Sequence, residues 1–172
     1  DPRSVEECTI AELMELDIKK DGYTDKIVIF EDFLQKFAFR DLTFAIELKG
    51  EGVEKDTADL LRKYRLEKKA VITSFKLDYI KNFIAYTPEF EFGLLTKEVT
   101  PEIEAELLSL GATEICPRAT LMSAEDVARW HSMGLRVRAW GVKDEEVMRF
   151  ACECGVDGMT CNFPDKLEAY RS

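Results

Sequence analysis

Short apolar or β-branched runs recur along most of the chain at nearly even intervals. Amphipathic segments of helical period separate them. Strands that alternate with helices at this spacing are typical of successive βα units with parallel strand pairing. The pattern predicts six strands, which begin near Phe44, Ala70, Glu91, Thr113, Leu135 and Val156.

The residues between these runs carry the signals that begin and end helices. Ser123 stands three residues before Asp126 at the spacing of a capping box, and Pro101 follows Thr100 as a first helical residue. Glycine just after an amphipathic segment is a typical helix stop. We expect helix starts at Thr100, Ser123, Asp144 and Pro164, stops at Gly111, Gly134 and Gly155, and a last helix that reaches Tyr170.

Even spacing favours a βα barrel over an open doubly wound sheet. The sequence contains no Gly-x-Gly-x-x-Gly and no Gly-Lys-Ser/Thr, which excludes the dinucleotide-binding and P-loop patterns. An eight-unit barrel usually needs about 250 residues. The fold class is therefore α/β, a TIM-type barrel represented by about six βα units, and residues 41–172 correspond to units three to eight.

Residues 1–40 follow a different pattern. Thr9 and Glu12 form a capping box for a short helix that ends near Leu16, and Asp21-Gly22 is a turn signal. The apolar run at 27–29 leads into a helix that contains phenylalanines at 30, 33 and 37. We interpret residues 1–40 as an insertion segment with its following helix, within one domain that spans 1–172.

Composition narrows the classes of function. Hydrophobic residues make up 46% of the chain, which indicates a globular protein, and no apolar run approaches the ~20 residues of a membrane span. The net charge of −10 argues against nucleic-acid binding. Five cysteines with one histidine argue against structural zinc and indicate reduced thiols. We expect a cytoplasmic protein, although a chain that begins with Asp1 leaves a signal peptide open.

The most informative segment is Phe44–Lys49, whose sequence is Phe-Ala-Ile-Glu-Leu-Lys. By strand parity, Phe44, Ile46 and Leu48 face one side, and Glu47 and Lys49 face the other. Barrel active sites lie at the carboxyl ends of the strands, where these two charged side chains would enter the lumen. They predict a functional site, or alternatively a mutual ion pair or a water-filled barrel interior.

Other candidate residues lie at the ends of later strands. Arg136, Arg138 and Trp140 share a strand face, and Trp140 at the strand's carboxyl end is either a core plug or the wall of a pocket. Ser74 and Phe75 are expected at the same rim. His131 is expected mid-helix on the outer layer, away from the mouth. A Ser-His-Asp hydrolase is therefore disfavoured, and no nearby base suggests that Cys161 is a nucleophile.

The chain resembles the glycerophosphodiester phosphodiesterase family over nearly its whole length. No single segment is specific, but together they occur in the family's order and spacing, although Ile29 and Phe30 replace the usual proline-containing start of one helix. The matching segments are Thr9–Leu13, Leu16–Asp17, Ile29–Leu34, Ile46–Lys49, Val71–Phe75, Gly134–Trp140 and Val156–Thr160.

The resemblance implies a βα barrel that hydrolyses glycerophosphodiesters to glycerol 3-phosphate and an alcohol with Mg²⁺ or Ca²⁺. It assigns Glu47 as a metal ligand, Lys49 as a catalytic phosphate contact and Trp140 as a substrate-binding wall. Asn162 stands where the family often has aspartate, and no role transfers to it. The family's His-Arg-Gly strand, its strand with two acidic ligands and its second histidine have no counterpart in this sequence.

Two explanations of these differences stay open. In the first, the sequence is a fragment of the enzyme, inactive alone, whose substrate is a small phosphodiester. In the second, it is a catalytically inactive truncated barrel that acts as a binding or assembly module. Six strands of a barrel leave two edges, so we expect a homo-oligomer or a complementing N-terminal segment.

Overall fold

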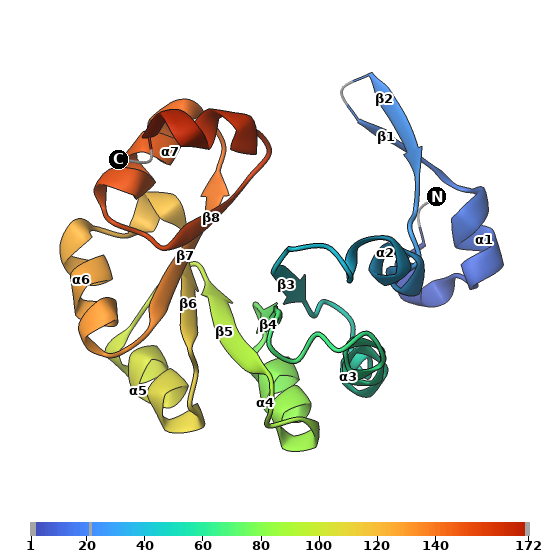
Figure 1. Cartoon of the computed structure of the whole chain (residues 1–172), viewed down its shortest axis with the longest axis horizontal. Coiled ribbons are helices and arrows are strands. Elements are labelled where there is room, and N and C mark those ends of the chain that lie inside the picture. The colour runs from blue at the N-terminus through green and yellow to red at the C-terminus, as the bar shows by residue number, and fades with distance from the viewer. Residues whose placement is uncertain (1–2, 21, 171–172) are drawn as a thin grey trace.

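Residues 3–20 and 22–170 are described by a computed structural model. Six parallel strands form a curled sheet, and helices cover its convex side (Figure 1). A small N-terminal unit lies beside the β3 end of this sheet (Figure 1). The architecture is that of an α/β half-barrel.

The six strands of the curled sheet pair strictly in chain order, and every pair is parallel. Each begins within two residues of the start that the apolar pattern predicts. The order contains no reversal, which confirms a barrel-type sheet over a doubly wound one. The strands are β3 (Phe44–Glu47), β4 (Ala70–Ser74), β5 (Glu91–Thr96), β6 (Glu114–Pro117), β7 (Arg136–Val142) and β8 (Gly158–Cys161).

The helices begin and end at the expected residues. The side chain of Thr100 accepts a hydrogen bond from the backbone N–H of Ile103, and Ser123 and Asp126 form a complete capping box. Gly111 ends its helix with φ 80°, a conformation that favours glycine. The helices are α2 (Phe30–Phe37), α3 (Glu54–Lys63), α4 (Leu77–Tyr86), α5 (Pro101–Leu110), α6 (Ala124–Ser132) and α7 (Glu145–Glu153), with 3₁₀ helices η2 (Ala119–Leu121) and η3 (Pro164–Tyr170).

The N-terminal unit holds an element that the sequence pattern did not predict. The 3₁₀ helix η1 (Val5–Glu7) and helix α1 (Ile10–Glu15) come first, and α1 has the expected Thr9–Glu12 capping box. An antiparallel hairpin of β1 (Asp17–Lys20) and β2 (Tyr23–Lys26) follows. All eight strand residues are exposed, so no apolar alternation marks them. The turn predicted at 21–22 is seen at Gly22, while Asp21 lies outside the described residues.

The hydrophobic core lies between the sheet and its helices in two clusters. One joins α2, α3 and α4 to β3, β4 and the start of β5, and the other joins α5, α6 and α7 to the rest of β5 and to β6, β7 and β8. Phe44 and Leu48 point into this core and are 7% and 3% exposed, whereas Ala45 and Glu47 line a pocket on the concave face. The predicted parity of β3 is confirmed, and it directs Glu47 into the lumen.

Within the described residues, every helix is too short or too polar to cross a membrane. The thiols of Cys116 and Cys154 are buried, and those of Cys8 and Cys161 are partly buried.

Candidate active site at the carboxyl ends of the strands

Glu47 is the last residue of β3, and Lys49 follows it on the same side of the chain. The Lys49 Nζ lies 3.3 Å from the Glu47 Oε2, so the two side chains form an ion pair. The Glu47 side chain is 31% exposed and the Lys49 side chain 76% exposed. The structure therefore shows the ion pair that the sequence left as one alternative, and both partners remain accessible from the barrel mouth.

A pocket of about 280 Å³ on the concave face contains Glu47. Its walls come from the consecutive strands β3, β4 and β5 and from the last two strands, β7 and β8, so it is a tertiary feature of the curled sheet. The lining residues are Ala45, Glu47, Thr73, Phe75, Leu95, Arg138, Trp140, Gly141 and Thr160. Glu47 and Trp140 thus line the same pocket, as expected if both side chains point into the lumen.

Trp140 is a wall of this pocket and is only partly buried. Its indole N–H donates a hydrogen bond of 3.1 Å to the Thr96 carbonyl, and the Phe75 ring stands perpendicular to it with centroids 5.0 Å apart. We expected Trp140 at the end of its strand, but β7 continues to Val142 through an irregular register at Gly141, whose φ is 77°. These contacts fix the ring's orientation at the mouth.

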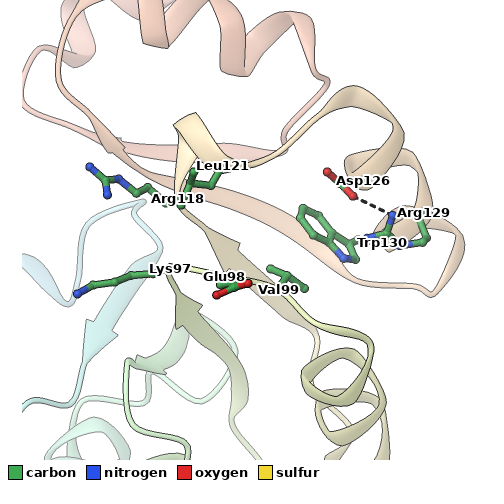
Figure 2. A pocket seen from close by; sticks show the side chains of 8 residues that line it. All are labelled: Lys97, Glu98, Val99, Arg118, Leu121, Asp126, Arg129 and Trp130. Atoms are coloured by element: carbon green, nitrogen blue, oxygen red, sulfur yellow. Dashed lines mark ion pairs between the residues drawn. The ribbon is translucent and has the colours of Figure 1, made fainter.

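Arg118 is a residue of this mouth that the sequence analysis did not single out. It directly follows β6, forms a parallel backbone bridge with Trp140, and places its guanidinium carbon 5.8 Å from the centre of the Trp140 ring. Lys97 directly follows β5 (Figure 2). The sequence did contain a signal for this pair, because a basic residue directly follows each of two neighbouring strands. Parallel strands end at the same edge of the sheet, so the two cations are expected near one another.

Lys97 and Arg118 also line a groove of about 550 Å³ between the β5 and β6 ends and helix α6 (Figure 2). On its other side, the Arg129 guanidinium pairs with Asp126 and with Glu104 at 2.8 Å each. Figure 2 shows Lys97 and Arg118 extending away from this paired group. Lys97 and Arg118 therefore lie on one side of the groove, and the paired Arg129 lies on the other.

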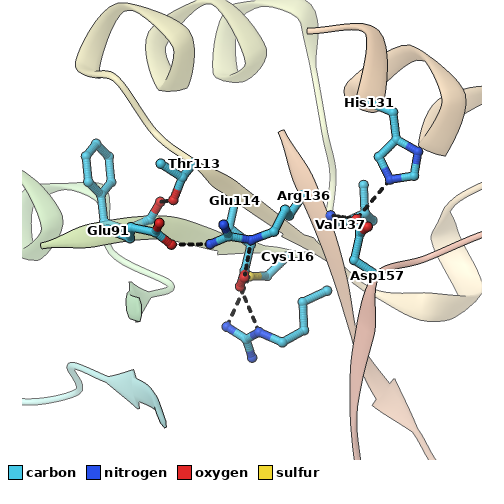
Figure 3. A network of polar contacts seen from close by, with 10 residues as sticks. Glu91, Thr113, Glu114, Cys116, His131, Arg136, Val137 and Asp157 are labelled. Atoms are coloured by element: carbon cyan, nitrogen blue, oxygen red, sulfur yellow. Dashed lines mark hydrogen bonds and ion pairs between the residues drawn. The ribbon is translucent and has the colours of Figure 1, made fainter. Parts of the chain in front are cut away.

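A layer of charged side chains lies deeper in the lumen, toward the amino ends of the strands (Figure 3). Glu114 is 5% exposed and accepts a 2.7 Å hydrogen bond from the Arg138 Nε, and Arg136 pairs with Glu91. A buried carboxylate such as that of Glu114 persists only when it is paired in this way, whereas Arg136 and Glu91 are exposed. Strand parity predicted that Arg136 and Arg138 share a face, but it did not predict that Glu91 and Glu114 form ion pairs with them.

Cys116 belongs to this deep layer. Its Sγ lies 3.1 Å from the Glu114 Oε1. Burial raises the pKa of the Cys116 thiol, and the neighbouring Glu114 carboxylate raises it further. The thiol therefore stays protonated and is a structural hydrogen-bond donor rather than a nucleophile.

Ser74 and His131, which a serine hydrolase would need side by side, have different partners in the structure. Ser74 is 1% exposed and donates a 2.7 Å hydrogen bond to the Leu48 carbonyl, which joins the ends of β3 and β4. His131 lies near the end of α6, on the outer layer as expected, and its Nε2 is 2.8 Å from the Asp157 carboxylate (Figure 3). Asp157 also accepts from the Val137 N–H. The His131–Asp157 pair thus pins α6 to the region before β8.

Cys161 and Asn162 lie at the end of β8. Cys161 is the last residue of the strand and is partly buried, and Asn162 is exposed directly after it. Their positions agree with the mouth location expected from the sequence, and the structure adds no reactive partner for Cys161 within residues 3–20 and 22–170.

The carboxylates at the mouth do not amount to a metal shell. No group of three or more histidine, cysteine, aspartate or glutamate side chains suited to hold a metal ion occurs in the described part of the chain. Divalent cations such as Mg²⁺ and Ca²⁺ take six or more oxygen ligands, of which Glu47 can supply one or two. The described residues therefore supply one ligand residue, Glu47, and not a complete coordination shell.

Comparison with known proteins places this site in a family. The chain is 26% identical over 156 residues to the Bacillus subtilis (strain 168) protein YqiK, described as uncharacterized, and the match covers 86% of this chain and 64% of that protein. The chain thus spans less than two thirds of this relative's length.

Two solved structures share the fold. A crystal structure from Silicibacter pomeroyi DSS-3 matches with a TM-score of 0.87 at 22% identity, covering 98% of this chain and 69% of that one. A phosphodiesterase of Oleispira antarctica, solved in complex with the product sn-glycerol-3-phosphate, matches with a TM-score of 0.74 at 17% identity and covers 96% and 71%.

The curled parallel sheet, with helices on its convex side and a pocket at the carboxyl ends of its strands, has the architecture of part of a TIM-type barrel. The sequence pattern of the glycerophosphoryl diester phosphodiesterase family matches residues 1–166. The chain belongs to this family.

Proposed function

We propose that the full-length protein hydrolyses glycerophosphodiesters to glycerol 3-phosphate and an alcohol. The observation that carries the proposal is the family match over residues 1–166, with Glu47 and Lys49 at the carboxyl end of β3. The product bound in the Oleispira antarctica phosphodiesterase supports the same reaction class. The pocket on the concave face, at about 280 Å³, suits a small substrate or the reacting part of one.

Glu47 and Lys49 are proposed to work as a pair at the reacting phosphate. The Glu47 carboxylate, directed into the lumen by strand parity, is a ligand for a divalent cation, and the Lys49 ammonium contacts the phosphate oxygens. In the structure each side chain neutralises the other at 3.3 Å. Lys49, which is 76% exposed, has room to turn from the carboxylate to a bound phosphate.

Trp140 is proposed to form an apolar wall for the substrate. Its hydrogen bond to Thr96 and its contact with Phe75 hold the ring at a fixed angle in the pocket that contains Glu47. A rigid aromatic wall limits the orientations of the bound diester and so helps to position its phosphate.

The cofactor is proposed to be Mg²⁺ or Ca²⁺. When bound, such a cation stabilises negative charge that develops on the phosphoryl oxygens. Because Glu47 belongs to no group of three or more potential metal ligands in the described part of the chain, the remaining donors must come from elsewhere.

A second candidate function is a catalytically inactive barrel that binds a partner. The observation that favours it is the sheet itself: in the described part of the chain, β3 and β8 each pair with a neighbour on one side only. Such edges present unpaired backbone donors and acceptors that another strand can satisfy. The proposed occupant is a second copy of this chain or a complementing segment.

Release of glycerol 3-phosphate from glycerophosphodiesters by the full-length protein, with and without Mg²⁺ or Ca²⁺, separates these candidates. We expect turnover that exhaustive chelation removes and added cation restores. Turnover that survives chelation would refute the metal role, and absence of turnover with every cation would favour the binding module.

A further inference from the structure

We propose that Arg118, assisted by Lys97, selects the leaving alcohol by charge, so that diesters with an anionic alcohol are preferred over those with a cationic one such as choline. This inference rests on the proposed function and adds to it the class of substrate. It starts from Arg118, which neither the sequence pattern nor the family resemblance marked.

Arg118 is held at the rim of the pocket by its backbone and by its side chain. Its backbone bridges to Trp140, and its side chain runs past the next residue, Gly141, where a Cβ would lie 3.6 Å from the Arg118 Cγ. The guanidinium then lies over the Trp140 ring, 5.8 Å from its centre. A stacked guanidinium keeps its N–H groups, which lie in its own plane, free for an oxygen ligand.

The Arg118 charge is not neutralised by the protein. Arg118 makes no ion pair with any acidic side chain of the described chain, and neither does Lys97. This contrasts with Arg129, Arg136 and Arg138, each of which meets a carboxylate. In a protein of net charge −10, two unpaired cations at adjacent strand ends form a local positive region.

The acidic neighbour in this region does not cancel it. Glu98 lines the same groove as Lys97 and Arg118. Figure 2 shows its carboxylate lying near Val99, whereas Lys97 extends the other way. Glu47, on the floor of the pocket, is already paired with Lys49. The rim of the pocket is therefore cationic on the side of β5 and β6.

The aromatic side chains strengthen the selection. Trp140 and Phe75 form the kind of aromatic corner that could bind a quaternary ammonium group through cation–π contacts. Here Arg118 already occupies a position over the Trp140 ring, so a choline headgroup would meet a like charge. An anionic alcohol would instead gain a charge-assisted hydrogen bond from the same group.

The test compares kcat/KM of the full-length protein for three diesters. Glycerophosphoinositol 4-phosphate carries an anionic alcohol, glycerophosphocholine a cationic one, and glycerophosphoglycerol serves as the neutral reference. We expect the anionic diester to exceed the choline diester by about tenfold or more, as one charge-assisted contact allows. A preference for choline, or equal values, would overturn the inference.

Variants identify the residue responsible. Arg118→Gln is expected to lower the anionic-to-choline ratio about tenfold, and Arg118→Glu to invert it. Arg149→Gln removes the same charge on the outer helix α7, where Arg149 pairs with Glu153, and is expected to leave the ratio unchanged. If Arg118 had a merely structural role, Arg118→Gln would change all three substrates by the same factor and leave their ratio intact, which would contradict the inference.

Binding distinguishes this inference from the proposed function. If the full-length protein hydrolyses none of the three diesters, the proposed function fails. The charge preference is then read from calorimetric titration with the anionic and the choline diester, for the wild type and for Arg118→Gln. Tighter binding of the anionic diester that Arg118→Gln abolishes supports the selection, and equal affinities reject it.

Discussion

The Lys49 ammonium lies 3.3 Å from the Glu47 carboxylate at the mouth of the curled sheet. Because both side chains are partly or largely exposed, their mutual attraction is screened by water and contributes only about 0–1 kcal/mol to stability. Exchange of the ion pair for a bound cation at Glu47 and a bound phosphate at Lys49 would therefore cost little free energy of folding. The ion pair therefore adds little to the stability of the fold, which is compatible with the proposed binding roles of Glu47 and Lys49.

Glu47→Gln in the full-length protein is expected to reduce metal-supported turnover by on the order of 100-fold or more, because the amide keeps the size but loses the charge that binds a hard cation. The measurement is glycerol 3-phosphate release across a range of Mg²⁺ or Ca²⁺ concentrations. Thermal unfolding should stay close to that of the wild type, since the lost ion pair is exposed.

The matched control for this change is Glu146→Gln, which removes an exposed carboxylate from α7. It should leave turnover unaltered. Near-wild-type activity of Glu47→Gln at low cation concentration would mean that Glu47 is only the ion-pair partner of Lys49.

Lys49→Ala is expected to weaken the handling of the anionic diester, with KM raised by about tenfold, because an ammonium contact to phosphate is lost. Lys49→Arg should restore part of the effect. Lys68→Ala, which removes an exposed lysine just before the amino end of β4, is the matched control. Initial rates over a range of diester concentrations provide the measurement, and an unchanged KM in Lys49→Ala would remove Lys49 from the site.

Gly93→Ala is expected to destabilise the fold by about 1–3 kcal/mol, as overpacking does. A Cβ at Gly93 would lie 2.7 Å from the backbone oxygen of Glu114, in the neighbouring strand β6, and backbone cannot move aside cheaply. At Gly158, also in a strand of the sheet, the added Cβ would meet the Arg138 Cγ at an ordinary 3.6 Å. Denaturant unfolding should show Gly158→Ala near the wild type, and equal effects of the two changes would refute the packing argument.

The 172-residue chain by itself is expected to show no phosphodiesterase activity. The described residues bring the Glu47–Lys49 pair to the mouth but no group of three or more side chains suited to hold a metal ion, and His131 lies on the outer layer, paired with Asp157. A glycerol 3-phosphate release assay on the purified chain checks this. Metal-dependent hydrolysis, with contaminating longer protein excluded by mass spectrometry, would contradict it.

The same chain is expected to self-associate or to bind a complementing segment. In the described structure, the outer edges of β3 and β8 have no strand partner, so their backbone groups can pair with another chain. Analytical ultracentrifugation over a range of concentrations measures the association. A monodisperse monomer with cooperative melting in dilute solution would be the contrary result.

Much of the fold was predictable because its signals are local. The starts of the six strands, the caps at Thr100, Ser123 and Asp144, and the inward direction of Glu47 each depend on a few neighbouring residues. Apolar period, capping chemistry and strand parity act within one element and need no knowledge of its neighbours. The hairpin β1–β2 was missed because its strands are exposed and show no apolar alternation.

The sequence by itself determined where the six strands of the curled sheet begin and that Glu47 faces the lumen. Only the tertiary structure decided that Arg118 lies over Trp140, that Phe75 stands against the same ring, and that Glu114 meets Arg138. These contacts join different strands, and their geometry depends on the parallel register and on the curl of the sheet. Those two properties arise from packing of the whole barrel wall, and no local segment encodes them.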